Sequence, residues 1–323
     1  MPGRLAGAAR AAGRGARWLG GLVSAVFRRV FAHNVTGRAS QYAYSAFLAT
    51  VPFLFVLVAT VGLVASENVY DDLIRDFEEQ IPDSFEGLIE AALTAATENS
   101  RTAAIALAAG LVGGLIVVSN VMVTLMGALD LAYGVRHRPW LKGRIVAFAL
   151  AAAESVLALL TTLALVGGPR LVEATAELVG VDGGGVVRAA QRAVFVVGLL
   201  ALVVLTLVLY RFGPNTRVHR VSEILPGALV AVLAWVGTTR LFRLFVENFD
   251  QYSNVYGALA TVVVYLWYLY VSGMTLLVGA ELNGELAHRR AVRDALRAQT
   301  PAAPPAAPLD TAETTRPLAR PGP

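Results

Sequence analysis

Six apolar segments of this chain are each long enough to cross a lipid bilayer as an α-helix. They cover approximately residues 42–65, 103–133, 145–167, 191–211, 224–246 and 256–280. A transmembrane helix needs about 20 mostly apolar residues. Hydrophobic residues make up 56% of the chain and charged residues only 15%, which excludes a soluble domain of ordinary composition. The sequence therefore predicts an all-α integral membrane protein with six transmembrane helices.

Basic residues follow every second apolar segment, and this asymmetry indicates the direction of each crossing. Arginine and lysine are retained on the cytoplasmic side of a membrane. The connection between the first two segments is acidic instead, from Glu67 to Glu98, so it can cross to the other side. Both termini are thus predicted to be cytoplasmic. The basic residues after the second, fourth and sixth segments are Arg136, Arg138, Lys142, Arg144, Arg211, Arg217, Arg220, Arg289, Arg290, Arg293 and Arg297.

The same pattern predicts three parts of the chain. Residues 1–38 form a basic cytoplasmic leader that could lie as an amphipathic helix against anionic lipid. Residues 39–290 form the membrane domain, whose extracytoplasmic segment 66–101 has the apolar spacing of two short amphipathic helices separated at Pro82. Residues 291–323 form a cytoplasmic tail, which is rich in Pro and Ala and disordered from about residue 300.

Several enzyme classes lack their sequence requirements here. The chain has no cysteine, and its histidines, His33, His137, His219 and His288, are never paired at the helical spacing of metal ligands. No G-x-S-x-G, P-loop or H-E-x-x-H motif occurs, and no soluble domain could hold RNA. We therefore expect no metal, no cofactor, no nucleic-acid partner and no enzymatic activity. The one catalytic alternative is a lipid-modifying site that uses Asp130 or Glu281.

Glu154 is the one carboxylate predicted near the middle of the bilayer, because it lies about 15 Å beyond Arg144 along a helix. At that depth the carboxyl could be neutral and donate a hydrogen bond to a neighbouring helix, or it could exchange protons along a pathway. Asn120 is its expected partner by depth, with Ser119 beside it in the second segment. A structural role and a role in transport both stay open for this group.

Proline and glycine residues predict where helices bend, end or pack closely. Pro52 should kink the first segment. Gly110 and Gly114 form a G-x-x-x-G in the second, which favours close helix packing and allows a homo-oligomer. Gly213 and Pro214 should end the fourth helix just after Arg211, which could contact a lipid head group at the cytoplasmic edge.

The stretch LLVGAELNGEL, residues 276–286, closes the last apolar segment with three polar residues. Asn283 ends a stripe of small and hydroxyl-bearing residues that should face the helix bundle. Glu281 points about 200° away from Asn283 on a helix, and Glu285 follows it one turn later. We therefore expect an acidic edge separate from Asn283. The expected cytoplasmic polar network comprises Arg211, Asp130, Glu281, Asn283 and Arg38.

Local patterns in residues 25–290 together resemble the YihY/BrkB family of bacterial inner-membrane proteins, older members of which were labelled ribonuclease BN. The resemblance implies six helices, a plasma-membrane location and links to serum resistance and export of envelope components. The family more often has asparagine at the position of Asp130, so a role of that amide does not transfer. The patterns are SQYAYSAFLATVPFLFVLVATVG with Pro52, ALDLAYGV (128–135), RPWLKGR (138–144), YRFGPN (210–215), LPGAL (225–229) and NFDQYSNVYGALATVVVYLWYLYVSGMTLLVGAELNGEL (248–286).

Two functional hypotheses follow. The first is a bacterial plasma-membrane transporter or exporter of envelope-related or lipidic substrates, with the lipid bilayer and anionic lipids as partners. Because no ATP-binding motif is present, its energy would come from a proton gradient, a partner or the substrate gradient. The second is a scaffold for envelope integrity that transports nothing. A hydrated cavity that reaches Glu154 would favour the first hypothesis.

Overall fold

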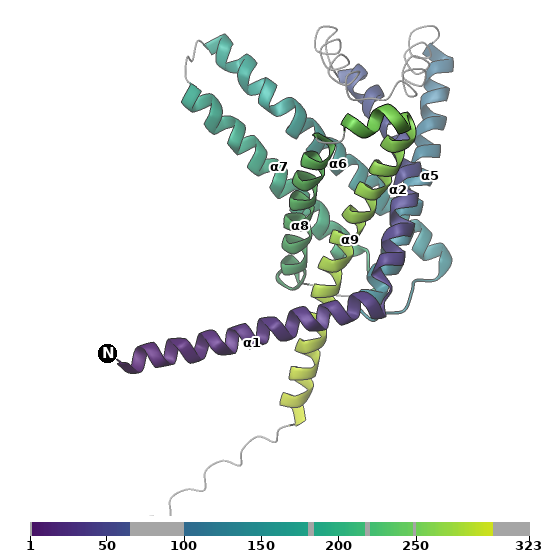
Figure 1. The fold of residues 1–323 in the computed structure, drawn as a ribbon. Helices are drawn as coiled ribbons and strands as arrows, with labels where there is room; N and C mark the ends of the chain where they lie inside the picture. The colour runs from purple at the N-terminus through teal and green to yellow at the C-terminus, as the bar shows by residue number, and fades with distance from the viewer. Residues whose placement is uncertain (1, 65–99, 180–183, 217–219, 248–249, 300–323) are drawn as a thin grey trace, which may run out of the picture. The chain divides into compact units, whose positions relative to one another are not determined.

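The computed structural model describes residues 2–64, 100–179, 184–216, 220–247 and 250–299 (Figure 1). All regular structure within these ranges is α-helical. The predicted amphipathic helices of residues 66–101 and the predicted disorder from residue 300 lie outside them. The helices are α1 (Pro2–Ala32), α2 (Val35–Val64), α5 (Ser100–Ala132), α6 (Trp140–Val179), α7 (Gly184–Phe212), α8 (Val221–Glu247) and α9 (Asp250–Gln299).

Five of the described helices are long and apolar enough to cross a membrane. Their apolar stretches are Val112–Ala132, Trp140–Thr161, Val187–Phe212, Val221–Phe245 and Val262–Gln299, in α5 to α9. The first predicted span, 42–65, overlaps α2, whose side chains after Pro52 are outside the described set. The prediction of an all-α membrane protein is thus confirmed.

Several helices extend beyond the apolar segments that predicted them. Most of the predicted leader, 1–38, forms α1, its last residues begin α2, and α9 continues through the basic residues as far as Gln299. Hydropathy marks only the part of a helix that lipid surrounds, whereas Ala, Leu, Glu and Arg all favour helix beyond it.

Two residues with positive φ mark sharp turns of the chain. Asn34 has a φ of 48° between α1 and α2, and its Oδ1 accepts the backbone N–H of Gly37 at 3.3 Å. This contact satisfies one of the unpaired donors in the first turn of α2. Gly134 has a φ of 66° just after α5, a conformation that a residue with a Cβ rarely adopts.

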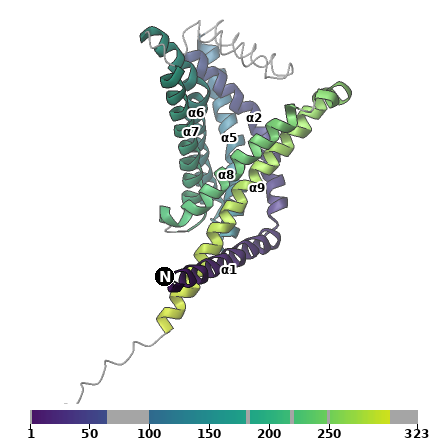
Figure 2. The ribbon, with the colours of Figure 1, turned by 60° about the vertical axis from the view of Figure 1, so that its left-hand side comes forward.

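Successive helices pack against each other in the order α2, α5, α6, α7 and α8, and α1 contacts α2. Figures 1 and 2 both show α6 and α7 side by side along their length. Small residues dominate the buried core, which allows the helix backbones to approach closely. Its members include Ala39, Ala128, Ala132, Ala147, Ala151, Ala228, Ala231 and Ala280, with Leu129, Leu209, Tyr210, Ile224 and Leu277 between them.

Gly114 provides the close approach between α5 and α2. A Cβ added to Gly114 would lie 2.9 Å from the Cβ of Pro52. The surroundings of Gly110, the other glycine of the G-x-x-x-G, lie outside the described side chains.

The chain divides into two compact units, Met1–Ala287 and His288–Pro323. The core and the polar clusters described below lie in the first unit. In the described part of the second unit, the exposed side chains of Arg293 and Asp294 lie 3.9 Å apart.

Candidate functional site

Glu281 on α9 is held by one side chain of α1 and one of the residue that follows it. Its Oε2 accepts a hydrogen bond of 2.9 Å from Arg29 Nε, and its Oε1 lies 2.6 Å from His33 Nδ1. Arg29 also donates to the carbonyl oxygen of Ala132 at the end of α5, and its Nη1 lies 3.9 Å from Glu285. Both oxygens of a carboxylate that is only 2% exposed are thus occupied. This group, the Glu281 cluster, joins α1, α5 and α9.

Arg29 and His33 can act together because they lie one helical turn apart, near the end of α1. Truncating one partner of a buried ion pair leaves the other charge uncompensated, at a cost of about 3–5 kcal/mol when both are fully buried. Arg29 is 22% exposed, so solvent reduces this value here.

Asn283, two residues after Glu281, bonds a different helix. Its Oδ1 accepts the backbone N–H of Gly227 at 2.8 Å, and its Nδ2 donates to the carbonyl of Ile224 at 2.8 Å. Pro226 lies between these two backbone groups of α8 and has no N–H of its own. One amide side chain that is 1% exposed thus satisfies two backbone groups in the first turns of α8.

Three glycines let α9 approach its neighbours closely. A Cβ on Gly227 would clash with the carbonyl oxygen of Gly279, and one on Gly279 would lie 2.5 Å from that of Gly227. A Cβ on Gly284 would clash with the carbonyl oxygen of Ala132. Figures 1 and 2 show α8 and α9 next to each other at this crossing. The close packing of α9 around Asn283 therefore requires glycine on α9 and at the facing position of α8.

The stripe of small and hydroxyl residues on α9 is a packing surface in the described part of the chain. Tyr265 Oη lies 2.9 Å from Thr50 Oγ1 on α2, and Tyr268 Oη lies 3.3 Å from Thr239 Oγ1 on α8. Tyr210 of α7 donates to the carbonyl of Leu276. Hydrogen bonds from this stripe thus reach three helices.

A second polar cluster, the Asp130 cluster, connects the α5–α6 turn to the residues after α7. Asp130 Oδ1 accepts the backbone N–H of Asn215 at 2.7 Å, and its Oδ2 lies 2.9 Å from His137 Nδ1. Arg138 donates to the carbonyls of Phe212, Gly213 and Pro214. The carboxylate and the guanidinium thus both extend from the α5–α6 side and bond backbone groups at and after the end of α7.

The remaining residues expected in the cytoplasmic network occupy other positions. Arg38 Nε donates to the carbonyl of His33 at 3.2 Å, so it supports the residue that binds Glu281. Arg211 is half-buried at the end of α7, and none of the described contacts joins it to Asp130 or Glu281. Gly213 and Pro214 follow α7 directly and are buried; a Cβ on Gly213 would lie 2.5 Å from Leu129 Cδ1.

Glu154 lies on α6 and is 5% exposed. Its Oε1 has no hydrogen-bond partner among the described residues. Asn120, the expected partner, is exposed on the outer side of α5, whereas Ser119 is buried and donates to the carbonyl of Ile116 at 2.7 Å. Neighbouring residues on a helix point about 100° apart, and here Ser119 faces the bundle whereas Asn120 does not.

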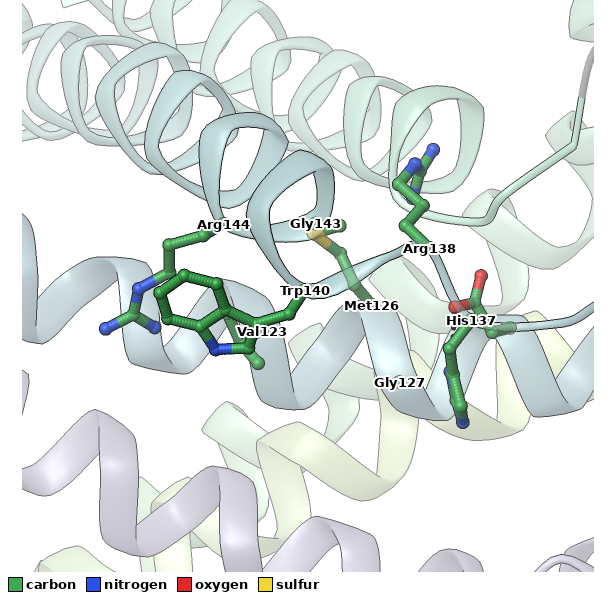
Figure 3. Close-up of a pocket in the computed structure, with 9 residues that line it drawn as sticks. Val123, Met126, Gly127, His137, Arg138, Trp140, Gly143 and Arg144 are labelled. Carbon is green, nitrogen blue, oxygen red and sulfur yellow. Dashed lines mark hydrogen bonds and ion pairs between the residues drawn. The ribbon is translucent and has the colours of Figure 1, made fainter.

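A pocket of about 320 Å³ opens between α5 and the start of α6 (Figure 3). It does not include Glu154. Within the described ranges no three His, Asp or Glu side chains lie close enough together to hold a metal ion. The pocket is lined by Val123, Met126, Gly127, Asp130, His137, Arg138, Trp140, Gly143 and Arg144.

Arg29 and His33 were not identified from the sequence as the partners of Glu281. Both lie in or next to the basic leader, where many arginines look alike. Their spacing of four residues, next to a turn at Asn34, was the available signal, because it places a cation and an imidazole on one helical face.

Comparison with known proteins gives a family and several relatives. Residues 26–304 match the family model described as virulence factor BrkB. A Bacillus subtilis (strain 168) protein named as ribonuclease-like, YfkH, is 29% identical over 272 residues, or 83% of this chain and 96% of the relative. A UPF0761 membrane protein of Pseudomonas aeruginosa (strain LESB58) is 27% identical over 286 residues. Another, from Ralstonia nicotianae (strain ATCC BAA-1114 / GMI1000), is 29% identical over 269 residues.

The aligned part of this chain spans 64% of the Pseudomonas protein and 57% of the Ralstonia protein. No solved structure matches the chain. The family model covers most of its length, two of these relatives are named as membrane proteins, and five described helices can cross a membrane. The chain is therefore a multi-pass bacterial membrane protein that belongs to the family described as virulence factor BrkB.

Proposed function

We propose that this protein is a plasma-membrane transporter or exporter of lipidic or envelope-related substrates. The observation that carries the proposal is the buried carboxyl of Glu154, whose Oε1 has no hydrogen-bond partner among the described residues. A buried polar atom without a partner costs about 1–3 kcal/mol, and more when the group is charged. An ionisable residue inside a transmembrane helix is thus retained for a reason other than stability.

The other buried acidic groups provide the contrast. Asp130 and Glu281 each have a hydrogen-bond partner on both carboxylate oxygens. All three acidic residues lie within apolar stretches long enough to cross a membrane, but of the three only Glu154 has an oxygen without a partner among the described residues. A polar substrate group, water or a proton pathway would supply the interaction that its Oε1 lacks.

The proposed topology has six spans, with the segment 42–65 of α2 as the first and both termini in the cytoplasm. Its support is the set of basic residues next to the Asp130 cluster, among them Arg136, Arg138 and Arg144. In this topology α1 lies on the cytoplasmic surface of the bilayer. It exposes an apolar stripe at steps of four residues, which suits partial burial among lipid head groups: Leu19, Val23, Phe27 and Phe31.

The alternative is a scaffold for envelope integrity that moves no substrate. The completely paired Glu281 cluster favours it, because such a cluster serves to fix helices in one arrangement. Neither reading includes catalysis. The oxygens of Asp130 and Glu281 are both occupied by the protein's own donors, which leaves a lipid-modifying role without a free base.

The test is lipid movement in proteoliposomes that contain the full-length protein and an NBD-labelled phosphatidylethanolamine. Dithionite bleaches only the outer leaflet, so the rate of further bleaching measures transfer between leaflets. We expect transfer with the wild type and a loss of at least about tenfold with Glu154→Gln, which removes the ionisable group but not its volume. Asp294→Asn, which removes an exposed carboxylate, is the matched control and should retain the wild-type rate.

Two outcomes count against the proposal. Bleaching equal to that of protein-free vesicles would leave the scaffold as the better account. Equal rates for Glu154→Gln and Asp294→Asn would assign Glu154 to helix packing.

A further inference from the structure

The pocket between α5 and the start of α6 lies where two apolar stretches end. Val112–Ala132 ends beside it, and Trp140–Thr161 begins there. A site at the ends of two spans lies at the level of lipid head groups. Trp140 lines the pocket and is 80% exposed, as expected of an indole at the boundary between lipid and water.

Arg144 is the cation of this pocket that is available to a ligand. Arg138 is occupied by three backbone carbonyls, and His137 is bonded to Asp130. No oxygen of the described residues accepts a hydrogen bond from Arg144; its guanidinium carbon lies 5.7 Å from the ring centroid of Phe148.

Arg144 therefore lies between two aromatic side chains on one face of α6. Trp140, Arg144 and Phe148 follow each other at steps of four residues, so they share that face. Figure 3 shows the Trp140 and Arg144 side chains on the same side of the helix start. A guanidinium offers several N–H donors in a planar arrangement that matches the oxygens of a phosphate.

The surrounding charges favour an anion. The one acidic group of the pocket, Asp130, has both oxygens occupied, by the Asn215 N–H and by His137. The first turn of α6 also lies at this pocket, since Trp140 and Gly143 line it, and a helix N-terminus carries the positive end of the helix dipole. Lys142 adds a further positive charge nearby without lining the pocket.

The rest of the pocket is apolar. Val123 and Met126 of α5 form its apolar wall, and Gly127, which has no side chain, lies beside them. A volume of about 320 Å³ is at the lower limit for a small-molecule site, which suits a head group better than a whole lipid. A phosphate at the polar end would leave an acyl chain to continue along Val123 into the bilayer.

We propose that this pocket binds the phosphoglycerol part of an anionic phospholipid, with Arg144 on the phosphate and Val123 and Met126 against the start of an acyl chain. The site goes beyond the proposed transport function and does not depend on it, because neither Glu154 nor any transported substrate takes part. A resident lipid at this position would couple the ends of α5 and α6 to the composition of the membrane.

The test is a titration of the purified full-length protein in detergent, followed by native mass spectrometry. The three probes are dihexanoyl-phosphatidylglycerol, dihexanoyl-phosphatidylcholine and glycerol 3-phosphate. We expect phosphatidylglycerol to bind at least about tenfold more tightly than either of the others, and Arg144→Gln to remove that difference. Lys142→Gln is the matched control, since it removes the same charge two residues away and should change binding less than about twofold.

Equal affinities for phosphatidylglycerol and phosphatidylcholine would overturn the proposal, and so would equal effects of Arg144→Gln and Lys142→Gln. Tight binding of glycerol 3-phosphate would overturn the assignment to a membrane lipid, because a soluble phosphate ester would then suffice. A circular dichroism spectrum and elution volume like those of the wild type show that each variant is folded.

Discussion

His33, directly after α1, and Glu281 on α9 are joined by a hydrogen bond of 2.6 Å, although 248 residues separate them in the sequence. Arg29, one turn before His33, occupies the second oxygen of the same carboxylate. Both partners of the Glu281 carboxylate thus come from the end of α1 and the residue that follows it, which adds a polar contact with α9 to the packing of α1 on α2.

Replacing Arg29 should loosen α1 more than it disturbs the bundle. We expect Arg29→Gln to lower stability by about 1–3 kcal/mol, because Glu281 loses its permanent cation but keeps the His33 contact. Trypsin should then cut faster at Arg17 and Arg28 within α1. Arg28→Gln, which changes an exposed neighbouring arginine, is the control for thermal unfolding in detergent. The same melting temperature for both variants would show that the Arg29 contact contributes nothing measurable.

Asn283→Leu should destabilise the junction of α8 and α9. The substitution keeps a similar volume but leaves the Gly227 N–H and the Ile224 carbonyl without their partner, at about 1–3 kcal/mol for each group. Asn120→Leu removes the same amide from an exposed position of α5 and should change the melting temperature little. If both leucine variants melt together with the wild type, the backbone groups of α8 have another source of hydrogen bonds.

Gly279→Ala should separate α8 from α9 because the new Cβ would lie 2.5 Å from the carbonyl oxygen of Gly227. Adding a methyl group to a close contact of this kind costs about 1–3 kcal/mol. Gly237→Ala makes the same change on α8 where nothing lies within 4 Å, so it should leave stability unchanged or raise it slightly through helix propensity. A Gly279→Ala protein as stable as Gly237→Ala would mean that the two helices can shift at no cost.

The helices themselves could be predicted from the sequence because lipid imposes a simple requirement, about 20 apolar residues per crossing. The different surroundings of Glu281 and Asn283 could be predicted too, since helical geometry alone separates them by about 200°. Asn283 then bonds α8, while Glu281 bonds α1.

The partners of the acidic residues could not be predicted in the same way. Their predicted depth in the bilayer made Arg211 and Arg38 candidate partners of Glu281. The depth of a residue does not indicate which helices are neighbours. Arg29 reaches Glu281 because α1 turns at Asn34 and returns towards α9, and that turn depends on a single backbone conformation. Likewise Asn120 and Glu154 have similar predicted depths in the bilayer. The buried face of α5 nevertheless carries Ser119, and Asn120 is exposed.

The pairing of α1 with α9 also has a consequence for the order in which the chain is made. Arg29 and His33 leave the ribosome before any of the apolar helices, whereas Glu281 is synthesised near the end. The contacts with Glu281 can therefore form only after the last helix has been made. A nascent chain that stops before Glu281 can still pack α1 on α2, but Arg29 and His33 then have no carboxylate of α9 to bind.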